Sequence, residues 1–218
     1  MKLIIAVNQH NAIGIGDQLL EHIPEDLQRF KQITTNQTVV MGWNTFKSLN
    51  RISGLPNREN YVLTRKSAEE WAELQQEGYV GYNVNRIADW EDIRKMDYDT
   101  PGGVFIIGGS SLYNYAISHG YADEIFVTQI RQSQPVDVND PNLVKIFHDL
   151  YNFEKFNEQQ EEYGVSIWFC NELIETRHYE NSMVCGFVSE FVHNPETDWR
   201  GPTPNGSMYR FVTYSALY

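Results

Sequence analysis

The segment Val104-Phe105-Ile106-Ile107-Gly108-Gly109-Ser110-Ser111 is an apolar run that passes through two glycines into the start of a helix-like segment. A run that is apolar on both faces is typical of a strand in a covered parallel sheet. Glycine lets a ligand approach the backbone, and free amides at a helix N-terminus bind phosphate. The stretch predicts a strand–loop–helix unit. Gly-Gly turns after strands are common, so the motif alone identifies no ligand.

The same alternation extends outward through the first 130 residues, and it predicts an α/β fold with a mixed, largely parallel central β-sheet flanked by helices. Pro24 suits the first turn of the first helix, and Gly120 suits the end of the last one. The expected strands are Leu3–Val7, Val39–Met41, Tyr61–Leu63, Val104–Ile107 and Ile125–Val127. The expected helices are Glu25–Thr34, Thr45–Leu49, Ser67–Gln76, Asp89–Met96 and Ser110–His119.

The pattern changes after residue 130. Residues Phe153–Phe156, followed by apolar side chains at every second position from Tyr163 to Phe169, predict an antiparallel hairpin appended to the parallel strands. Beyond it, a loop rich in Pro, Gly and Asn, Asn194–Gly206, separates two strand-like runs, Gly186–Val192 and Tyr209–Tyr214. We expect one domain over residues 1–172 and a C-terminal extension of unknown role over residues 173–218.

Composition excludes several classes of protein. The 218 residues include 17 Lys and Arg against 29 Asp and Glu, so the net charge of −12 disfavours general binding to nucleic acid or to an anionic membrane. Cys170 and Cys185 lie in no metal or disulfide motif, the six histidines show no ligand spacing, and no run of 18 apolar residues occurs. We expect a cytoplasmic protein without a metal site, a monomer or a small homo-oligomer.

One carboxylate lies at an unexpected position. At 100° per residue, Asp26 falls on the same helical face as Ile23, Leu27, Phe30 and Ile33. An acid in a first turn often does no more than interact with the helix dipole. The alternative is a carboxylate held against an apolar wall, with a pKa raised by desolvation, that binds a cationic or amidine-like ligand edge or handles a proton.

A few cations are the second candidate feature, because an acidic protein must bind any anionic ligand with individual basic residues. Arg58 follows the turn Leu55-Pro56-Asn57, and Arg65 directly follows the strand that ends at Thr64. Arginines at strand ends can bind a carboxylate or a phosphate through two parallel hydrogen bonds, although such residues are more often solvated.

These motifs, in this order, resemble dihydrofolate reductase over about residues 1–172. The resemblance implies the fold of that family and an NADPH-dependent reduction of 7,8-dihydrofolate to tetrahydrofolate, with protonation of the adjacent ring nitrogen. The segments that carry it are Pro24-Glu25-Asp26-Leu27-Gln28-Arg29-Phe30-Lys31, Val40-Met41-Gly42-Trp43-Asn44-Thr45-Phe46-Lys47-Ser48-Leu49, Leu55-Pro56-Asn57-Arg58, Val62-Leu63-Thr64-Arg65, Ile106-Ile107-Gly108-Gly109 and Val127-Thr128-Gln129-Ile130.

The resemblance also implies the roles of individual residues. Asp26 would bind the amidine-like edge of the pterin, with Thr128 supporting it through water, and Arg58 would pair with the carboxylate of the glutamate tail. Thr64 and Arg65 would hold the 2′-phosphate and so favour NADPH. The expected folate wall is Ile4, Leu27, Phe30, Leu49, Leu55 and Ile107, and the remaining expected cofactor residues are Ala6, Ile13, Asn44, Thr45, Gly108, Gly109, Ser110 and Tyr113.

The sequence departs from the family pattern at two places and leaves one choice open. The family has Leu-Pro-Trp where this sequence has Leu19-Leu20-Glu21-His22, so Glu21 replaces a tryptophan that orders water near the pterin. The second departure is Trp43, which occupies a position where the family often has a basic residue that touches the cofactor. A second register would match Phe187–Phe191 and Tyr209–Val212 with the last two strands of the family and make residues 140–185 an insertion. We prefer the first register because it needs no large insertion.

Two other functions are compatible with parts of the sequence. The expected fold also resembles that of the pyrimidine reductase of the riboflavin pathway. That enzyme does not need an acid at the position of Asp26 or an arginine at the position of Arg58. A non-catalytic reductase-like subunit, retained for binding or assembly, is favoured by the missing tryptophan and by the long C-terminal segment. Asp26 and Arg58 argue against the pyrimidine reductase, and oxidation of NADPH that depends on dihydrofolate distinguishes an active reductase from the non-catalytic subunit.

Overall fold

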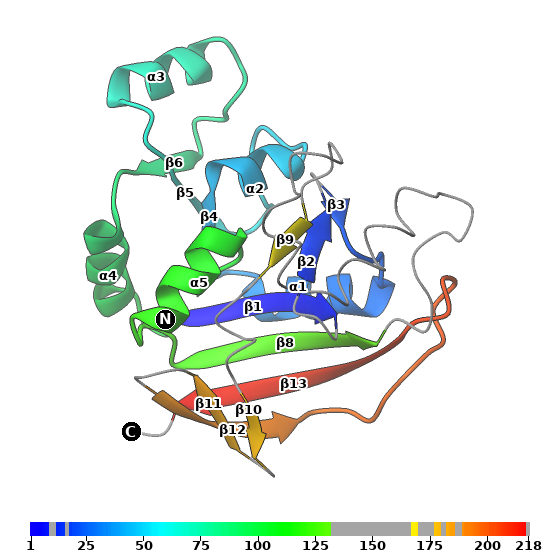
Figure 1. Ribbon diagram of the computed structural model, residues 1–218. Coiled ribbons are helices and arrows are strands. Elements are labelled where there is room, and N and C mark those ends of the chain that lie inside the picture. The colour runs from blue at the N-terminus through cyan, green and yellow to red at the C-terminus, as the bar shows by residue number, and fades with distance from the viewer. Residues whose placement is uncertain are drawn as a thin grey trace.

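The computed structural model describes residues 1–8, 12–15, 18–131, 167–169, 177–179, 182–185 and 189–216. These residues form a ten-stranded sheet with the order β10-β11-β12-β13-β8-β1-β7-β4-β5-β6 and a separate three-stranded sheet with the order β3-β2-β9 (Figure 1). From β8 to β6 all neighbouring strands are parallel, and from β10 to β8 all are antiparallel. The predicted mixed sheet is confirmed.

The parallel strands follow the apolar runs of the sequence. They are β1 (Lys2–Asn8), β4 (Thr38–Gly42), β5 (Glu59–Leu63), β6 (Val84–Ile87), β7 (Phe105–Ile106) and β8 (Glu124–Arg131). Five of the six were expected. The sequence did not predict β6, because this edge strand, Val84-Asn85-Arg86-Ile87, has apolar side chains only at its two ends.

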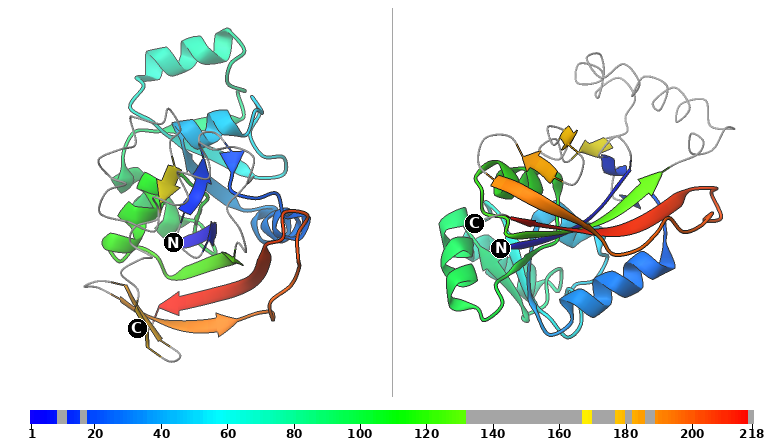
Figure 2. Two further views of the ribbon diagram at one scale, coloured as in Figure 1. Left: turned by 45° about the vertical axis from the view of Figure 1, so that its right-hand side comes forward. Right: turned by 90° about the horizontal axis from the view of Figure 1, so that it is seen from below.

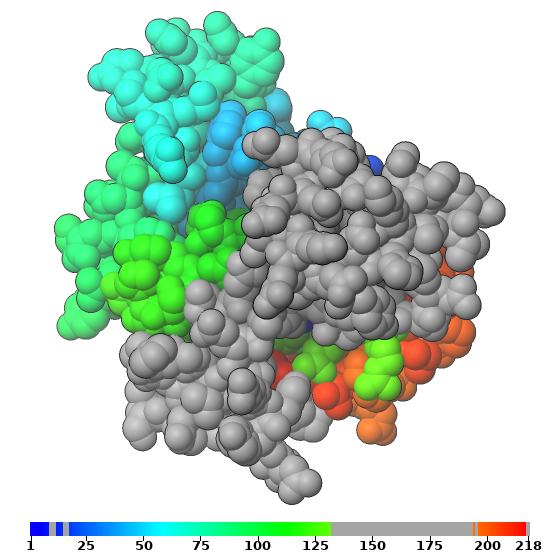
Figure 3. All heavy atoms as spheres, in the orientation of Figure 1, coloured from blue at the N-terminus to red at the C-terminus, as the bar shows by residue number. Residues whose placement is uncertain are grey.

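The five expected helices all form, with ends within three residues of the expectation. They are α1 (Pro24–Thr34), α2 (Trp43–Ser48), α3 (Ala68–Gln76), α4 (Trp90–Asp99) and α5 (Ser110–Ser118). Pro24 lies in the first turn of α1, as expected, and Gly120 follows α5 with a φ of 66° that glycine adopts without strain. Figure 3 shows that the segment around α3 protrudes at one end of the molecule.

Helices cover both faces of the sheet (Figure 2). Because strand side chains alternate, Leu3, Ile5 and Val7 of β1 pack with the apolar residues of α5, whereas Ile4 shares a cluster with residues that α1 covers. The core is therefore two apolar layers divided by the sheet. None of the helices in the described ranges is long and apolar enough to cross a membrane.

The C-terminal strands correct the preferred register. β13 (Met208–Ala216) is the antiparallel neighbour of β8, with Tyr209 opposite Ile130 and Val212 opposite Val127. β12 (Ser189–Pro195), β11 (Ser182–Cys185) and β10 (Arg177–Tyr179) continue the sheet outward. The predicted C-terminal hairpin thus exists, but β12 and β13 make it, as the second register requires.

The segment expected to fill that place lies elsewhere. β9 (Ile167–Phe169) pairs with β2 (Ala12–Ile15), which also pairs with β3 (Gln18–Leu19). The other expected hairpin strand, Phe153–Phe156, lies outside the described residues. Period-two patterning predicted a strand near residue 169 but could not identify its partner, because alternation sets which face is apolar and not which strand lies beside it.

Candidate active site

Asp26 lies in the first turn of α1, and its carboxylate faces the central sheet. Its Oδ1 accepts a hydrogen bond of 2.5 Å from the hydroxyl of Thr128, which is 1% exposed in the middle of β8. The side chain of Asp26 itself is half-buried. The structure therefore brings these two residues into direct contact, whereas the resemblance implied a contact through water.

The surroundings of Asp26 favour its protonated form. Burial raises the pKa of this carboxyl above its usual value, and the hydrogen bond from Thr128 and the charge of Arg29 act in the opposite direction with smaller effects. A carboxyl group with this balance keeps a proton closer to neutral pH than a solvated aspartate does. Such a group can bind an amidine-like edge or deliver a proton.

Most of the apolar residues expected beside this carboxylate form one cluster. Five of the six residues expected to wall the folate belong to one cluster or pack against it: Ile4, Phe30, Leu49, Leu55 and Ile107. The sixth, Leu27, is 38% exposed on α1, and Phe30, Leu49 and Leu55 are only half-buried. An acid beside incompletely covered apolar surface is the arrangement expected of a ligand site.

Arg58 is fixed at the C-terminal end of α1. Its guanidinium donates to the hydroxyl of Thr34 at 2.8 Å, to the carbonyl of Pro56 at 2.6 Å and to the carbonyl of Lys31 at 3.4 Å, and it lies 5.7 Å from the ring centre of Phe30. Burial lowers its pKa. A guanidinium has five N–H donors, and these contacts use three of them, so among the described residues two donors remain for an external carboxylate.

The glycine motif lies where β7 meets α5. Gly108 has a φ of 127°, its carbonyl accepts from the amide of Gly42 at 2.8 Å, and a Cβ atom added at Gly109 would lie 3.2 Å from the hydroxyl of Thr45. The N-cap residue of α5 is Gly109, which has no side chain that could cap the helix. The carboxyl ends of β4 and β7 thus expose backbone at close range to a helix N-terminus, which suits a phosphate group.

The other expected cofactor residues lie on elements that surround this junction. Tyr113 is buried and donates from its hydroxyl to the carbonyl of Ile4 at 2.7 Å. Ala6 lies opposite Thr128 in the β1–β8 pair, and Ile13 packs against the cluster under α5. Asn44 is exposed in α2, and Ser110 is the half-buried first residue of α5.

Two basic residues, the expected Arg65 and also Lys66, follow the end of β5. Thr64 is buried, Arg65 is exposed, and the ammonium of Lys66 lies 5.3 Å from the ring centre of Trp43. Trp43 also stacks on Phe46. The family often has a basic residue where this chain has Trp43. Lys66 therefore supplies a positive charge next to that position.

Two charged residues next to the first turns of α1 are buried: Glu21, which the sequence had already marked, and Arg29, which it had not. Glu21 is 8% exposed and accepts a hydrogen bond from the hydroxyl of Thr203, and Arg29 is 7% exposed and pairs with Glu196. The position of Arg29 one turn after Asp26 was the available signal. Their partners could not be found from spacing, because they lie more than 160 residues away in the chain.

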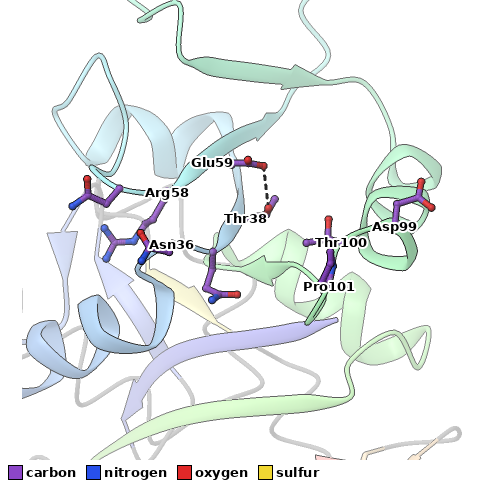
Figure 4. Close-up of a pocket in the computed structure, with 9 residues that line it drawn as sticks. Asn36, Thr38, Arg58, Glu59, Asp99, Thr100 and Pro101 are labelled. Atoms are coloured by element: carbon purple, nitrogen blue, oxygen red, sulfur yellow. Dashed lines mark hydrogen bonds between the residues drawn. The ribbon is translucent and has the colours of Figure 1, made fainter.

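A cavity of about 680 Å³ shares only Arg58 with the groups described above (Figure 4). Thr38 and Glu59, which begin β4 and β5, are joined there by a hydrogen bond, so the cavity is at the amino ends of the parallel strands. Its lining is Asn36, Gln37, Thr38, Asn57, Arg58, Glu59, Asp99, Thr100 and Pro101. Only Arg58 belongs to the expected site, because parallel sheets bind ligands at the carboxyl ends of their strands.

Comparison with known proteins agrees with this geometry. The family model described as dihydrofolate reductase matches residues 1–171. A dihydrofolate reductase of Haemophilus influenzae is 31% identical over 161 residues, which are 74% of this chain and 86% of that protein, and one of Staphylococcus aureus is 35% identical over 130 residues, 60% of this chain and 70% of that protein. A solved dihydrofolate reductase from Enterococcus faecalis, complexed with NADP(H), has a TM-score of 0.60 at 22% identity and covers 99% of this chain and 95% of its own. The chain belongs to the dihydrofolate reductase family.

Proposed function

We propose that this protein reduces 7,8-dihydrofolate to tetrahydrofolate with NADPH, and that Asp26 is the residue that controls protonation. The observation that carries the proposal is the half-buried carboxylate of Asp26, which accepts from Thr128 beside an incompletely covered apolar wall. The family membership supports the same reaction. No second activity is favoured by a specific contact among the described residues.

The proposed role of Asp26 follows from its two possible protonation states. When ionised, the carboxylate accepts hydrogen bonds from the N–H groups of the pterin's amidine-like edge and fixes the ring against the apolar wall. Because burial raises the pKa of Asp26, this carboxyl group is protonated at a higher pH than a solvated aspartate is, and it can then donate a proton within the site. Thr128 fixes the orientation of the carboxylate, and nitrogen N5 receives the proton.

The residues near Gly108 fit the nucleotide cofactor. Glycines at 108 and 109 keep Cβ atoms out of the space beside Thr45, and the N-cap of α5 is itself a glycine, so the first amides of this helix suit a pyrophosphate. We assign Gly108, Gly109, Thr45 and Ser110 to the nicotinamide and phosphate end. NADPH supplies the hydride, and the part of this chain is to hold the two rings together and exclude water.

A direct assay tests the proposal. The purified chain is mixed with NADPH and dihydrofolate, and oxidation of NADPH is followed by its absorbance at several pH values. We expect oxidation that depends on dihydrofolate and is absent with the pyrimidine substrate of the riboflavin pathway. Oxidation with only the pyrimidine, or binding of both ligands without turnover at any pH, would refute the proposal in favour of the other reductase or of a binding subunit.

Arg65→Ala is expected to raise the KM for NADPH by about 10- to 100-fold, the value of one charge-assisted hydrogen bond, and to leave the KM for NADH nearly unchanged. The reason is that only NADPH carries the 2′-phosphate that we assign to Thr64 and Arg65. Initial rates with each cofactor measure the effect. Arg94→Ala, an exposed arginine on α4, is the matched control, and equal losses with both cofactors would place Arg65 away from the phosphate.

Arg58→Met is expected to raise the KM for dihydrofolate by about 10- to 100-fold with little change in kcat, because we assign its two remaining N–H donors to the glutamate carboxylate. A dihydropterin that lacks the glutamate tail should be reduced equally well by both proteins. A similar loss with the shortened substrate would show that the variant only disturbs the contacts with Thr34 and Pro56.

The biological setting is also a proposal. We propose a cytoplasmic enzyme whose partners are the small molecules dihydrofolate and NADPH, present as a monomer or a small homo-oligomer. No group of three or more potential metal ligands occurs within the described part of the chain, and the proposed reaction uses none.

A further inference from the structure

The segment that links β12 to β13, residues 196–207, contacts α1 and the turn before it. Glu196 pairs with Arg29, and the hydroxyl of Thr203 donates to Glu21. Directly after the segment, burial raises the pKa of Tyr209, and the charge of Glu25 raises it further. Glu25 and Arg29 are one turn apart and share a face of the helix. We call residues 196–207 the α1 clasp.

The contact between Arg29 and Glu196 is the most constrained of these. Nη2 of Arg29 lies 2.5 Å from Oε1 of Glu196, and Nε lies 3.2 Å from Oε2, so the pair has two parallel hydrogen bonds. The guanidinium also lies 4.8 Å from the ring centre of Phe211 and 5.7 Å from that of Phe126. The hydroxyl of Thr213 donates to the same carboxylate. These contacts from β8, β13 and the clasp hold Arg29 at 7% exposure.

The same guanidinium acts on Asp26. Residues 26 and 29 are three apart, so their side chains are neighbours on α1, and the positive charge of Arg29 favours the ionised carboxyl of Asp26. Thr128 on β8 is the uncharged partner of Asp26. The acids around this part of α1 are Glu25 on the helix, Glu21 in the turn before it and Glu196 on the clasp. The clasp also carries a base, Arg200, whose guanidinium lies 5.8 Å from the ring centre of Phe211 and whose charge lowers the pKa of Tyr209.

We propose that the α1 clasp positions Asp26, and that the Arg29–Glu196 pair fixes both the place of this carboxylate and the charge that it meets. The proposal rests on the proposed function for its effect on turnover. Arg29 and Glu196 are positioning residues, because they act through Asp26. The family match ends at residue 171, so the clasp lies in the part of the chain that the match does not cover.

The pair predicts shifts of opposite sign in two single variants of the full chain. Arg29→Met removes the cation and leaves Glu196 unpaired, so the midpoint of the pH profile of kcat should move up by about one unit. Glu196→Gln leaves the cation uncompensated, and the midpoint should move down. Arg29→Lys keeps the positive charge, so the midpoint of its pH profile should lie close to that of the wild type. Arg94→Met removes an exposed pair with Glu91 and should move nothing.

A second readout separates this proposal from the proposed function. The pKa of Asp26 is measured by ¹³C NMR titration of the full chain labelled at its aspartates, with Asp26→Asn used for assignment. Opposite shifts in the two variants support the proposal even if the wild type has no reductase activity. Shifts of the same sign, or lower melting temperatures with no shift, would show that the pair only holds the fold together and would overturn it.

Discussion

Asp26→Asn is expected to lower kcat for dihydrofolate reduction by about 10²- to 10⁴-fold at neutral pH, the usual contribution of one general acid or base. The amide keeps the shape of the carboxyl and can still accept from Thr128, but it cannot carry the proton or the negative charge. The loss should be largest at neutral and high pH, where protonation of the substrate depends most on the enzyme. Steady-state rates across the pH range measure it.

The control for this variant is Asp92→Asn, which changes an exposed acid in the first turn of α4. It should leave kcat and its pH profile unchanged. A nearly normal rate in Asp26→Asn at neutral pH would contradict the role that we assign to Asp26.

The same variant should be more stable than the wild type at neutral pH. The folded state raises the pKa of Asp26, so folding disfavours the ionised form. The contribution of Asp26 to the stability of the fold is most favourable at pH values below the ordinary pKa of aspartate. It declines as the pH rises through the raised pKa of the folded state, and above that pKa it stays unfavourable. Melting curves should therefore show a higher Tm for Asp26→Asn at neutral pH and no gain in acid. An unchanged difference across the pH range would show that Asp26 is not desolvated.

Deletion of residues 173–218 is expected to prevent folding. It removes β13, whose residues from Met208 to Ser215 pair with β8 and whose buried side chains are Tyr209, Phe211, Val212 and Tyr214. At about 2–3 kcal/mol for each large buried side chain, the loss is comparable with the 5–15 kcal/mol that stabilises a whole domain. It would also uncover Thr128 on β8. Expression level, circular dichroism and activity of the truncated chain measure the effect.

Point variants keep this prediction testable if the truncated chain is insoluble. Tyr214→Ala, at a side chain with no exposure, should cost about 3–5 kcal/mol, and Ser215→Ala beside it should cost nearly nothing. A truncated chain with normal activity, or equal stability of the two variants, would show that β13 is dispensable, as the first register of the sequence analysis implied.

The sequence predicted the parallel half of the fold well because local signals agree there. The run Val39–Met41 is buried on both faces in β4, and Pro24 and Gly120 mark helix ends through their own backbone preferences. The antiparallel half was predicted less well. Both 167–169 and 208–216 form strands, and only tertiary packing decides that the second lies beside β8.

The candidate site shows the same division. The helical period placed Asp26 among apolar residues, and the structure adds the contact with Thr128 from 102 residues further along the chain. The face assigned to α1 was only partly right, since Leu27 is exposed while Arg29 is buried. An arginine is buried when a distant carboxylate and aromatic rings compensate for its desolvation, and helical spacing carries no information about partners such as Glu196 and Phe211.

The role of Asp26 can be seen in a crystal structure of the full chain with NADPH and a folate that the protein cannot reduce. We predict the amidine-like edge of the pterin within hydrogen-bond distance of the Asp26 carboxylate, and the nicotinamide beside Gly108 and Gly109 at the carboxyl ends of the strands. A pterin bound instead in the cavity beside Thr100, with Asp26 touching no ligand, would contradict the claim.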